Sequence, residues 1–162
     1  MRDVYYPDWL IRRILRDTNT IAMVGVSPRW IRPSYFAMKY LQTKGYTVVP
    51  VNPRAAGEEI LGEPVYASLL DVPGKVDLVD IFRRADQVGP VVDEAIEIGA
   101  PVAWMQLGIR NDEVAARAEA AGLTVIMNRC VKIEYGRLTG ELGWQGINTR
   151  VITSRRSKRI RA

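Results

Sequence analysis

The sequence predicts an α/β fold in which a mostly parallel five-stranded sheet is doubly wound, with helices on both faces. Three observations predict it. Apolar runs of strand length alternate with helical patterns along the 162 residues, which is typical of a parallel sheet. The run 21–26 is almost continuously apolar, as expected for a strand buried on both faces. Glycines follow three of the predicted helices, where helices commonly end.

The first predicted element is a helix over 8–17, in which Asp8 can cap the N-terminus and apolar residues recur at helical spacing. The strand 21–26 comes next. A helix over 34–44 and a second strand over 46–51 follow it. This order gives the first strand–helix–strand unit of the sheet.

The second half of the sequence predicts three more strands. They alternate with helical segments in this order: a helical turn at 68–72, a strand at 76–82, a helix at 87–98, a strand at 102–107, a helix at 111–121 and a strand at 123–127. Asn111 is a suitable cap for its helix. We therefore expect one domain over 1–138, with the helix 8–17 as an N-terminal addition, and a C-terminal extension over 139–162.

Composition narrows the class of protein. The 48% hydrophobic and 25% charged content is typical of a soluble globular protein. No apolar run reaches the roughly 18 residues of a membrane span, and the N-terminus does not resemble a signal peptide. A single cysteine excludes an internal disulfide framework. These features predict a cytoplasmic protein without a membrane contact.

The histidine count excludes several classes of chemistry, and the positions of the basic residues show where the net charge lies. The chain has no histidine, which excludes histidine-dependent triads, histidine metal ligands and phosphohistidine within its own residues. We predict no metal site and no catalytic residue. Six of the basic residues lie from Arg150 to Arg161 with no acid among them, and without these six the net charge of +5 falls to −1. The basic tail is predicted to be solvated, with at most weak nucleic-acid binding.

The turn after the first strand carries the first candidate binding residues. Gly25 permits a sharp turn, and the following helix N-terminus directs N–H groups and a dipole at one spot, which suits a phosphate. The predicted phosphate site comprises Gly25, Val26, Ser27, Pro28, Arg29, Arg32 and Ser34. The serines would donate hydrogen bonds and the arginines would supply charge. A plain strand-to-helix connection is the alternative.

The second strand ends in Asn52-Pro53-Arg54. A site for NAD usually has an acid at this point, to hold the ribose hydroxyls. Arginine instead favours a ribose that carries a phosphate, as in coenzyme A (CoA) and NADP. Asn52 could bind the ribose and Arg54 the phosphate. In the alternative interpretation, Asn-Pro only begins a turn.

Two further strand ends contribute candidates. Phe82 and Arg83 follow the third strand, where ligands bind in open α/β sheets, and could flank an adenine. Gln106 and the amide of Gly108 follow the fourth strand and could face the rest of the ligand. Ordinary packing and solvated arginines explain the same residues.

Over about 8–138, the chain resembles the stand-alone CoA-binding proteins. The resemblance rests on an ordered set of motifs: Gly25-Val26-Ser27-Pro28, Arg32-Pro33-Ser34, Asn52-Pro53, Ile81-Phe82-Arg83-Arg84, Trp104, Gln106, Gly108-Ile109 and Asn128-Arg129-Cys130. The chain is also similar to the N-terminal CoA-binding domain of the succinyl-CoA synthetase α subunit and of ADP-forming acyl-CoA synthetases. The resemblance implies a Rossmann-like fold, CoA or acyl-CoA as ligand, and possible homodimers.

This resemblance favours a non-catalytic carrier, sensor or regulatory module over an enzyme. Two alternatives remain open: an NADP-binding oxidoreductase, and an interaction protein that acts through its basic tail. The full Gly-x-Gly-x-x-Gly fingerprint is missing, which weakens the NADP interpretation. Cys130 is predicted to be a buried structural thiol. Alternatively, Arg129 and Lys132 favour its thiolate, which could form a mixed disulfide with CoA.

Overall fold

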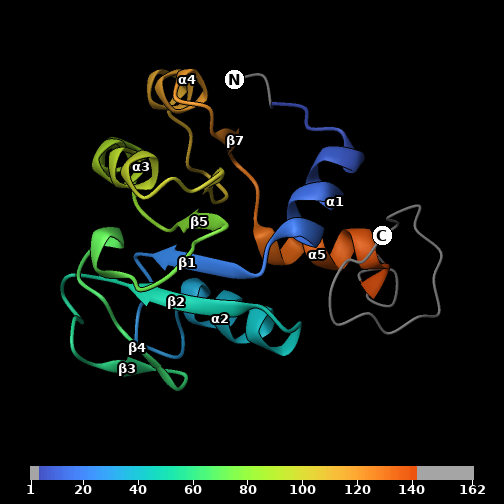
Figure 1. Ribbon diagram of the computed structural model, residues 1–162. Coiled ribbons are helices and arrows are strands. Elements are labelled where there is room, and N and C mark those ends of the chain that lie inside the picture. The colour runs from blue at the N-terminus through green and yellow to red at the C-terminus, as the bar shows by residue number, and fades with distance from the viewer. Residues whose placement is uncertain (1–3, 142–162) are drawn as a thin grey trace.

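The computed structural model describes residues 4–141. Its main sheet is parallel, with the strand order β2-β1-β5-β6-β7, and Figure 1 shows this arrangement. The strand bounds are β1 Thr20–Val24, β2 Thr47–Val51, β5 Leu78–Ile81, β6 Val102–Met105 and β7 Thr124–Ile126. The predicted five-stranded parallel sheet is confirmed.

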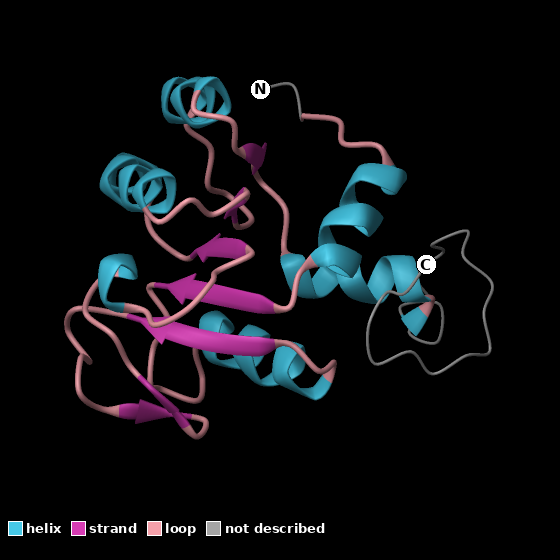
Figure 2. Cartoon of the chain, viewed as in Figure 1, coloured by secondary structure: helices cyan, strands magenta, loops and turns pink. Residues whose placement is uncertain are grey.

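Helices cover both faces of this sheet (Figures 1 and 2). The helix bounds are α1 Asp8–Asp17, α2 Pro33–Thr43, α3 Val88–Glu97, α4 Asp112–Ala120 and α5 Val131–Thr139, with short 3₁₀ helices at Leu69–Asp71 and Ala85–Gln87. One hydrophobic core joins α1, α2 and α5 to the sheet. A second core joins α3 and α4 to the opposite face. The doubly wound, Rossmann-like architecture is therefore confirmed.

Strand β1 shows why the first apolar run is nearly continuous. Ile21 and Met23 pack into the core beneath α1, α2 and α5, whereas Ala22 and Val24 pack into the core beneath α3 and α4. Alternate side chains of a strand point to opposite faces. Both sets are therefore apolar because both faces of the sheet are covered.

The order of the strands also places the site. β1 pairs with β2 on one side and with β5 on the other, so the chain changes direction across the sheet at β1. In open α/β sheets, ligands bind outside the carboxyl ends of the strands at such a reversal. The turn after β1 and the segment after β5 meet at this point.

A short hairpin and the last helix are absent from the predictions. β3 (Glu59–Ile60) and β4 (Glu63–Pro64) form a small antiparallel hairpin beside β2, and α5 follows the last strand. α5 packs against α1 and α2. An arginine on α1, Arg12, donates to the carbonyl of Leu138 at 3.2 Å.

Of the two predicted helix caps, one is confirmed and the other is wrong. The Asn111 side chain accepts a hydrogen bond from the Val114 N–H at 3.1 Å, so its capping role is confirmed. The predicted Asp8 cap is wrong: Pro7 holds the N-cap position and its side chain cannot accept a hydrogen bond. The Asp8 carboxylate instead pairs with Arg137 of α5 at 2.7 Å, because α5 lies beside the first turn of α1.

Contacts with the body run slightly past the predicted boundary at 138. α5 ends at Thr139, and the Glu141 carboxylate binds both Lys44 and the Tyr40 hydroxyl of α2. The rest of the predicted extension, 142–162, with the six basic residues of the tail, lies outside the described residues.

Candidate functional site

The turn after β1 is built around Gly25. Its φ of +89° lies in the left-handed region, which side-chain-bearing residues rarely adopt. A Cβ here would lie 2.5 Å from the Phe82 carbonyl oxygen, just after β5. The Gly25 N–H donates to the Val51 carbonyl at 2.8 Å. The turn is thus held against the C-terminal ends of both neighbouring strands.

Two serines organise the loop between Gly25 and α2. The Ser34 hydroxyl oxygen accepts from the Ser27 N–H at 3.1 Å, and the Ser27 hydroxyl oxygen accepts from the Arg29 N–H at 3.2 Å. These two amides are therefore not free for a phosphate, which corrects the general expectation that backbone N–H groups at this turn bind it. Each hydroxyl keeps its own proton to donate.

The start of α2 offers further donors. Pro33 is its first residue and has no N–H, and among residues 4–141 the Ser34 amide has no hydrogen-bond partner. The positive end of the helix dipole lies here as well. Arg29 and Arg32 are exposed on the same loop, where they can approach an anion.

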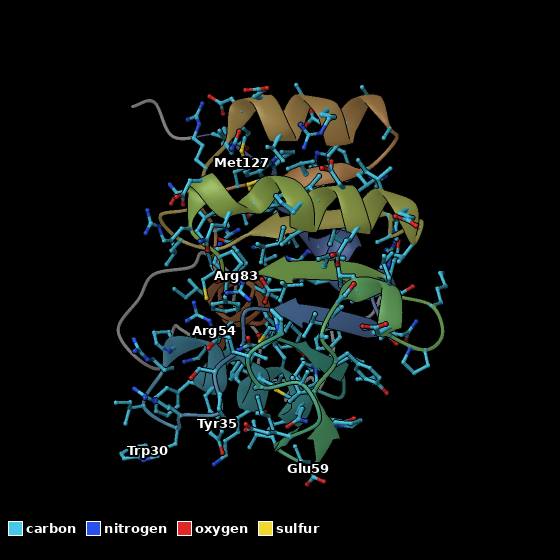
Figure 3. All side chains as sticks on the ribbon, turned by 90° about the vertical axis from the view of Figure 1, so that its left-hand side faces the viewer. Trp30, Tyr35, Arg54, Glu59, Arg83 and Met127 are labelled. Atoms are coloured by element: carbon cyan, nitrogen blue, oxygen red, sulfur yellow. The ribbon has the colours of Figure 1, made fainter. Side chains whose placement is uncertain are left out.

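Asn52 joins the loops that follow β1 and β2. Its Nδ2 donates to the Val26 carbonyl at 2.9 Å, and its Oδ1 accepts from the Arg54 N–H at 3.1 Å. The side chain thus has a structural role in addition to the predicted ribose contact. Pro53 and Arg54 are exposed. In Figure 3, Arg54 and Arg83 lie at the same edge of the sheet, beside the strand arrowheads.

A cavity of about 940 Å³ lies beyond the C-terminal ends of β5 and β6. It is lined by Ile31, Pro33, Phe36 and Ala37 from the start of α2, by 82–85 after β5, by 106–109 after β6, and by Cys130, Lys132 and Ile133 at the start of α5. Predicted site residues in this lining are Phe82, Arg83, Gln106, Gly108 and Cys130. The cavity therefore brings together residues that are up to about a hundred positions apart in the sequence.

Arg83 connects the cavity to the turn. Its Cδ lies 3.3 Å from the Cβ position of Gly25, so the side chain passes directly over the turn. The predicted residues of the loop 25–34 and of 52–54 do not line the cavity itself. The structure thus places the candidates in two adjoining groups, with Arg83 between them.

The Gly108 amide is not free, which corrects its predicted role as a donor to the ligand. It donates to the side-chain oxygen of Asn128 at 2.8 Å. Asn128 itself has a φ of +54°, a conformation that asparagine tolerates better than most residues. In the sequence, Asn128 counted only as part of the motif Asn128-Arg129-Cys130, although Asn next to a turn indicates such a local role.

Beneath the cavity lies a buried carboxyl group that the sequence analysis did not assign to the site. Asp80 of β5 is 0% exposed, and its Oδ1 accepts from Gln106 Nε2 at 2.5 Å. Among residues 4–141, no group forms a hydrogen bond with its Oδ2. Burial raises the pKa of Asp80 to about 7, against the opposing effect of the Gln106 hydrogen bond. The sequence feature that could have pointed to this group is an aspartate within an otherwise apolar strand.

Cys130 lies at the N-cap of α5 and lines the cavity. Burial raises the pKa of its thiol, and the charge of Asp80 raises it further, against hydrogen bonds from the amides of Ile133 and Lys132. The charge of Lys132 lowers this pKa, as predicted, but burial outweighs it and the pKa is raised overall. The Arg129 guanidinium donates instead to the carbonyls of Asn128 and Val4.

Comparison with known proteins identifies the family. The CoA binding domain family matches residues 19–136. The chain belongs to this family. The CoA-binding domain is 39% identical over 125 residues to the uncharacterized protein YneT of Bacillus subtilis, covering 77% of this chain and 91% of that protein. The resemblance noted from the motifs is thereby confirmed.

Two further relatives place the domain among solved structures and longer enzymes. A hypothetical protein from Pyrococcus horikoshii superposes on this domain with a TM-score of 0.79 at 40% identity, covering 85% of this chain and 99% of that one. An ADP-forming acetate–CoA ligase of Archaeoglobus fulgidus is 29% identical over 143 residues. That match covers 82% of this chain but only 20% of the ligase.

Within residues 4–141, no cluster of three or more histidine, cysteine, aspartate or glutamate residues could hold a metal ion. In the same region, every helix is too short or too polar to cross a membrane.

Proposed function

We propose that this CoA-binding domain binds CoA or an acyl-CoA without transforming it, as a carrier, sensor or regulatory module. The observation that carries the proposal is the turn at Gly25. It leaves no space for a side chain, and it stands beside the N-terminus of α2 with two serine hydroxyls in its loop. Such a cradle fits a pyrophosphate.

The two groups of candidate residues suit the two ends of CoA. Arg54 is exposed after β2, on the β2 side of the turn, and would meet the 3′-phosphate of the adenosine. The cavity lies on the β5 and β6 side and would receive the pantetheine arm. Phe82 and Arg83 line the cavity, so the proposal moves them from the predicted adenine contact to the pantetheine side.

Residues of this chain support the proposed non-catalytic role. It contains no histidine, so a phosphohistidine step has no acceptor among its residues. Burial raises the pKa of the Cys130 thiol and so disfavours its thiolate, and we do not assign it a nucleophilic role. The acetate–CoA ligase relative is about five times longer than the matched region.

An NADP-binding oxidoreductase is the second candidate, because Arg54 could equally bind a 2′-phosphate on the adenosine ribose. Binding preference separates the two. Isothermal titration calorimetry with CoA, 3′-dephospho-CoA, NADPH and NADH should show the tightest binding for CoA. Tighter binding of NADPH than of CoA would overturn the proposal.

The role of Arg54 has its own test. Arg54→Ala should weaken CoA binding by roughly ten- to a hundredfold, the range of one charged hydrogen bond of about 1.5–3 kcal/mol. The same variant should leave 3′-dephospho-CoA binding unchanged. Arg16→Ala is the matched control, since Arg16 is exposed at the end of α1 and pairs with Asp17. Equal losses for both ligands would contradict the assignment.

A further inference from the structure

The exposed apolar side chains of this domain concentrate at the cavity. Half of the large hydrophobic residues that are exposed among residues 4–141 line it: Ile31, Phe36, Leu107 and Ile133, with exposed fractions of 61%, 47%, 57% and 42%. They come from three separate segments, before and within α2, after β6, and in α5. Exposed apolar groups gathered around one hollow mark a surface that binds an apolar group.

Each charged side chain of the cavity lining lies against another part of the protein. Within the described part of the chain, 4–141, no acidic side chain lines the cavity. Arg83 lies over the Gly25 turn, Arg84 pairs with Asp86 at 3.1 Å, and the Lys132 ammonium lies 5.6 Å from the ring centre of Tyr40. The four exposed hydrophobic residues therefore form an apolar part of the cavity wall. A charged ligand group would gain no favourable contact there.

We propose that the ligand is an acyl-CoA whose apolar acyl chain, several carbons long, lies against Ile31, Phe36, Leu107 and Ile133. This inference rests on the proposed function, because the pyrophosphate at the Gly25 turn directs the thioester into the cavity. Free CoA would leave these side chains in water. A chain of methylene groups removes them from water, which is the main source of apolar affinity.

The shape of the site favours a small ligand over a second protein chain. The apolar residues border a hollow of about 940 Å³, which is within the usual size of small-molecule sites, about 300–1,000 Å³. A flat apolar face would suit a second copy of the chain better. The hollow also adjoins the turn that suits phosphate, so a single ligand can reach both.

The test is a chain-length series measured by isothermal titration calorimetry. CoA, acetyl-CoA, butyryl-CoA and octanoyl-CoA are titrated separately into the full chain, with succinyl-CoA as the charged comparison. Complete burial of one methylene is worth about fourfold in affinity, so partial burial should still make octanoyl-CoA at least tenfold tighter than acetyl-CoA. Succinyl-CoA should bind no better than acetyl-CoA.

Variants test whether the apolar residues of the cavity cause the dependence of affinity on acyl-chain length. Leu107→Ser with Ile133→Ser should reduce the octanoyl-to-acetyl affinity ratio to less than threefold. Leu70→Ser, which changes an exposed leucine on a 3₁₀ helix that does not line the cavity, should leave the ratio unchanged. The ratio is measured within each variant, so a general loss of ligand affinity does not affect it.

Each failure has its own signature. If no CoA compound binds, the proposed function fails and this inference fails with it. If CoA binds and chain length has no effect, or succinyl-CoA is preferred, only the acyl-chain inference is overturned. It is also overturned if the double variant leaves the ratio intact and instead dissociates a dimer in sedimentation velocity, since the face would then be an interface between copies.

Discussion

Asp80 is a residue whose surroundings disfavour its ordinary ionised state. Its carboxyl group is fully buried on β5 and has one hydrogen bond from Gln106, and its other oxygen has no hydrogen-bond partner among the described residues. A buried carboxylate in such surroundings is disfavoured relative to the neutral acid. Because Gln106 lines the cavity, the protonation of Asp80 adjoins the binding site.

The buried Asp80 carboxyl group should make the free energy of unfolding depend on pH. Burial raises its pKa to about 7, whereas the unfolded value is about 3.9. Between these values the folded protein holds a proton that the unfolded chain has released, so stability falls as the pH rises through this window and levels off above it. Asp80→Asn should flatten this slope, because the amide keeps an acceptor for Gln106 and does not titrate. Urea midpoints from pH 4.5 to 8 measure it.

Asp77→Asn is the control, because the two acids should behave oppositely. Burial tends to raise the pKa of Asp77, but hydrogen bonds from the Thr20 and Asn19 amides and from Lys75 outweigh it, so its pKa is lowered. Its contribution is lost only as the pH falls below about 4. The assignment to Asp80 is wrong if Asp80→Asn keeps the wild-type slope between pH 4.5 and 7.

Single residues of the site were predictable where local chemistry dictates their role. Glycine after a buried strand indicates a sharp turn, and Gly25 makes one. Asn52 and Gly108 differ because their partners come from distant segments: Val26 accepts from Asn52, and Asn128 accepts from Gly108. Spacing along one chain does not show which polar group another loop will already satisfy.

At the scale of elements, the connection from β1 to α2 determines the geometry of the proposed phosphate site. Gly25→Ala should therefore be strongly destabilising. A left-handed φ costs a side-chain-bearing residue about 1–2 kcal/mol, and the new Cβ would also collide with backbone, 2.5 Å from the Phe82 carbonyl oxygen. Urea unfolding measures the loss, and CoA titration at a temperature where the variant is folded measures the site.

Gly57→Ala separates the two causes. Gly57 has a φ of +86°, close to that of Gly25, but a Cβ there would meet nothing within 4 Å. Its loss of stability should therefore reflect the backbone strain alone and be smaller. Equal losses in the two variants would show that the approach to Phe82 has no energetic role.

The elements that sequence reasoning missed are those with weak local signals. β3 and β4 are two residues long, too short for an alternating pattern, and their position follows from packing beside β2. α5 has apolar residues at helical spacing, Val131, Tyr135 and Leu138. The pattern is interrupted by the buried residues Glu134 and Gly136, because Glu134 is buried in an ion pair with Arg137. Long periodic elements were predictable, whereas this one depends on a tertiary ion pair.

For the molecule as a whole, the two ends of the described chain meet on one face. α1 and α5 lie side by side (Figure 1), tied by the ion pair of Arg137 with Asp8. Neither helix belongs to the alternating pattern that predicts the sheet. The start of α5 nevertheless supplies Cys130, Lys132 and Ile133 to the cavity, so the segment after the last strand completes the site.

This arrangement predicts the effect of shortening the chain. A protein of residues 1–141 keeps the contacts of Glu141 with Lys44 and Tyr40, and every described residue of the site. Its net charge falls from +5 to −1, because the removed part holds the six basic residues and no acid. We expect CoA affinity within twofold of the full chain, and the loss of any salt-sensitive binding to a fluorescent single-stranded DNA probe.

A second truncation, to 1–138, tests where the domain ends. It removes Thr139 and Glu141, and with them the ion pair to Lys44 and the hydrogen bond from Tyr40, so it should unfold at a lower urea concentration than 1–141. If 1–141 itself loses CoA affinity more than tenfold, the extension belongs to the ligand site. If 1–141 and the full chain bind CoA alike but only the full chain captures the DNA probe, the domain and the basic tail act independently. This is the expected result, because the proposed ligand contacts all precede residue 142.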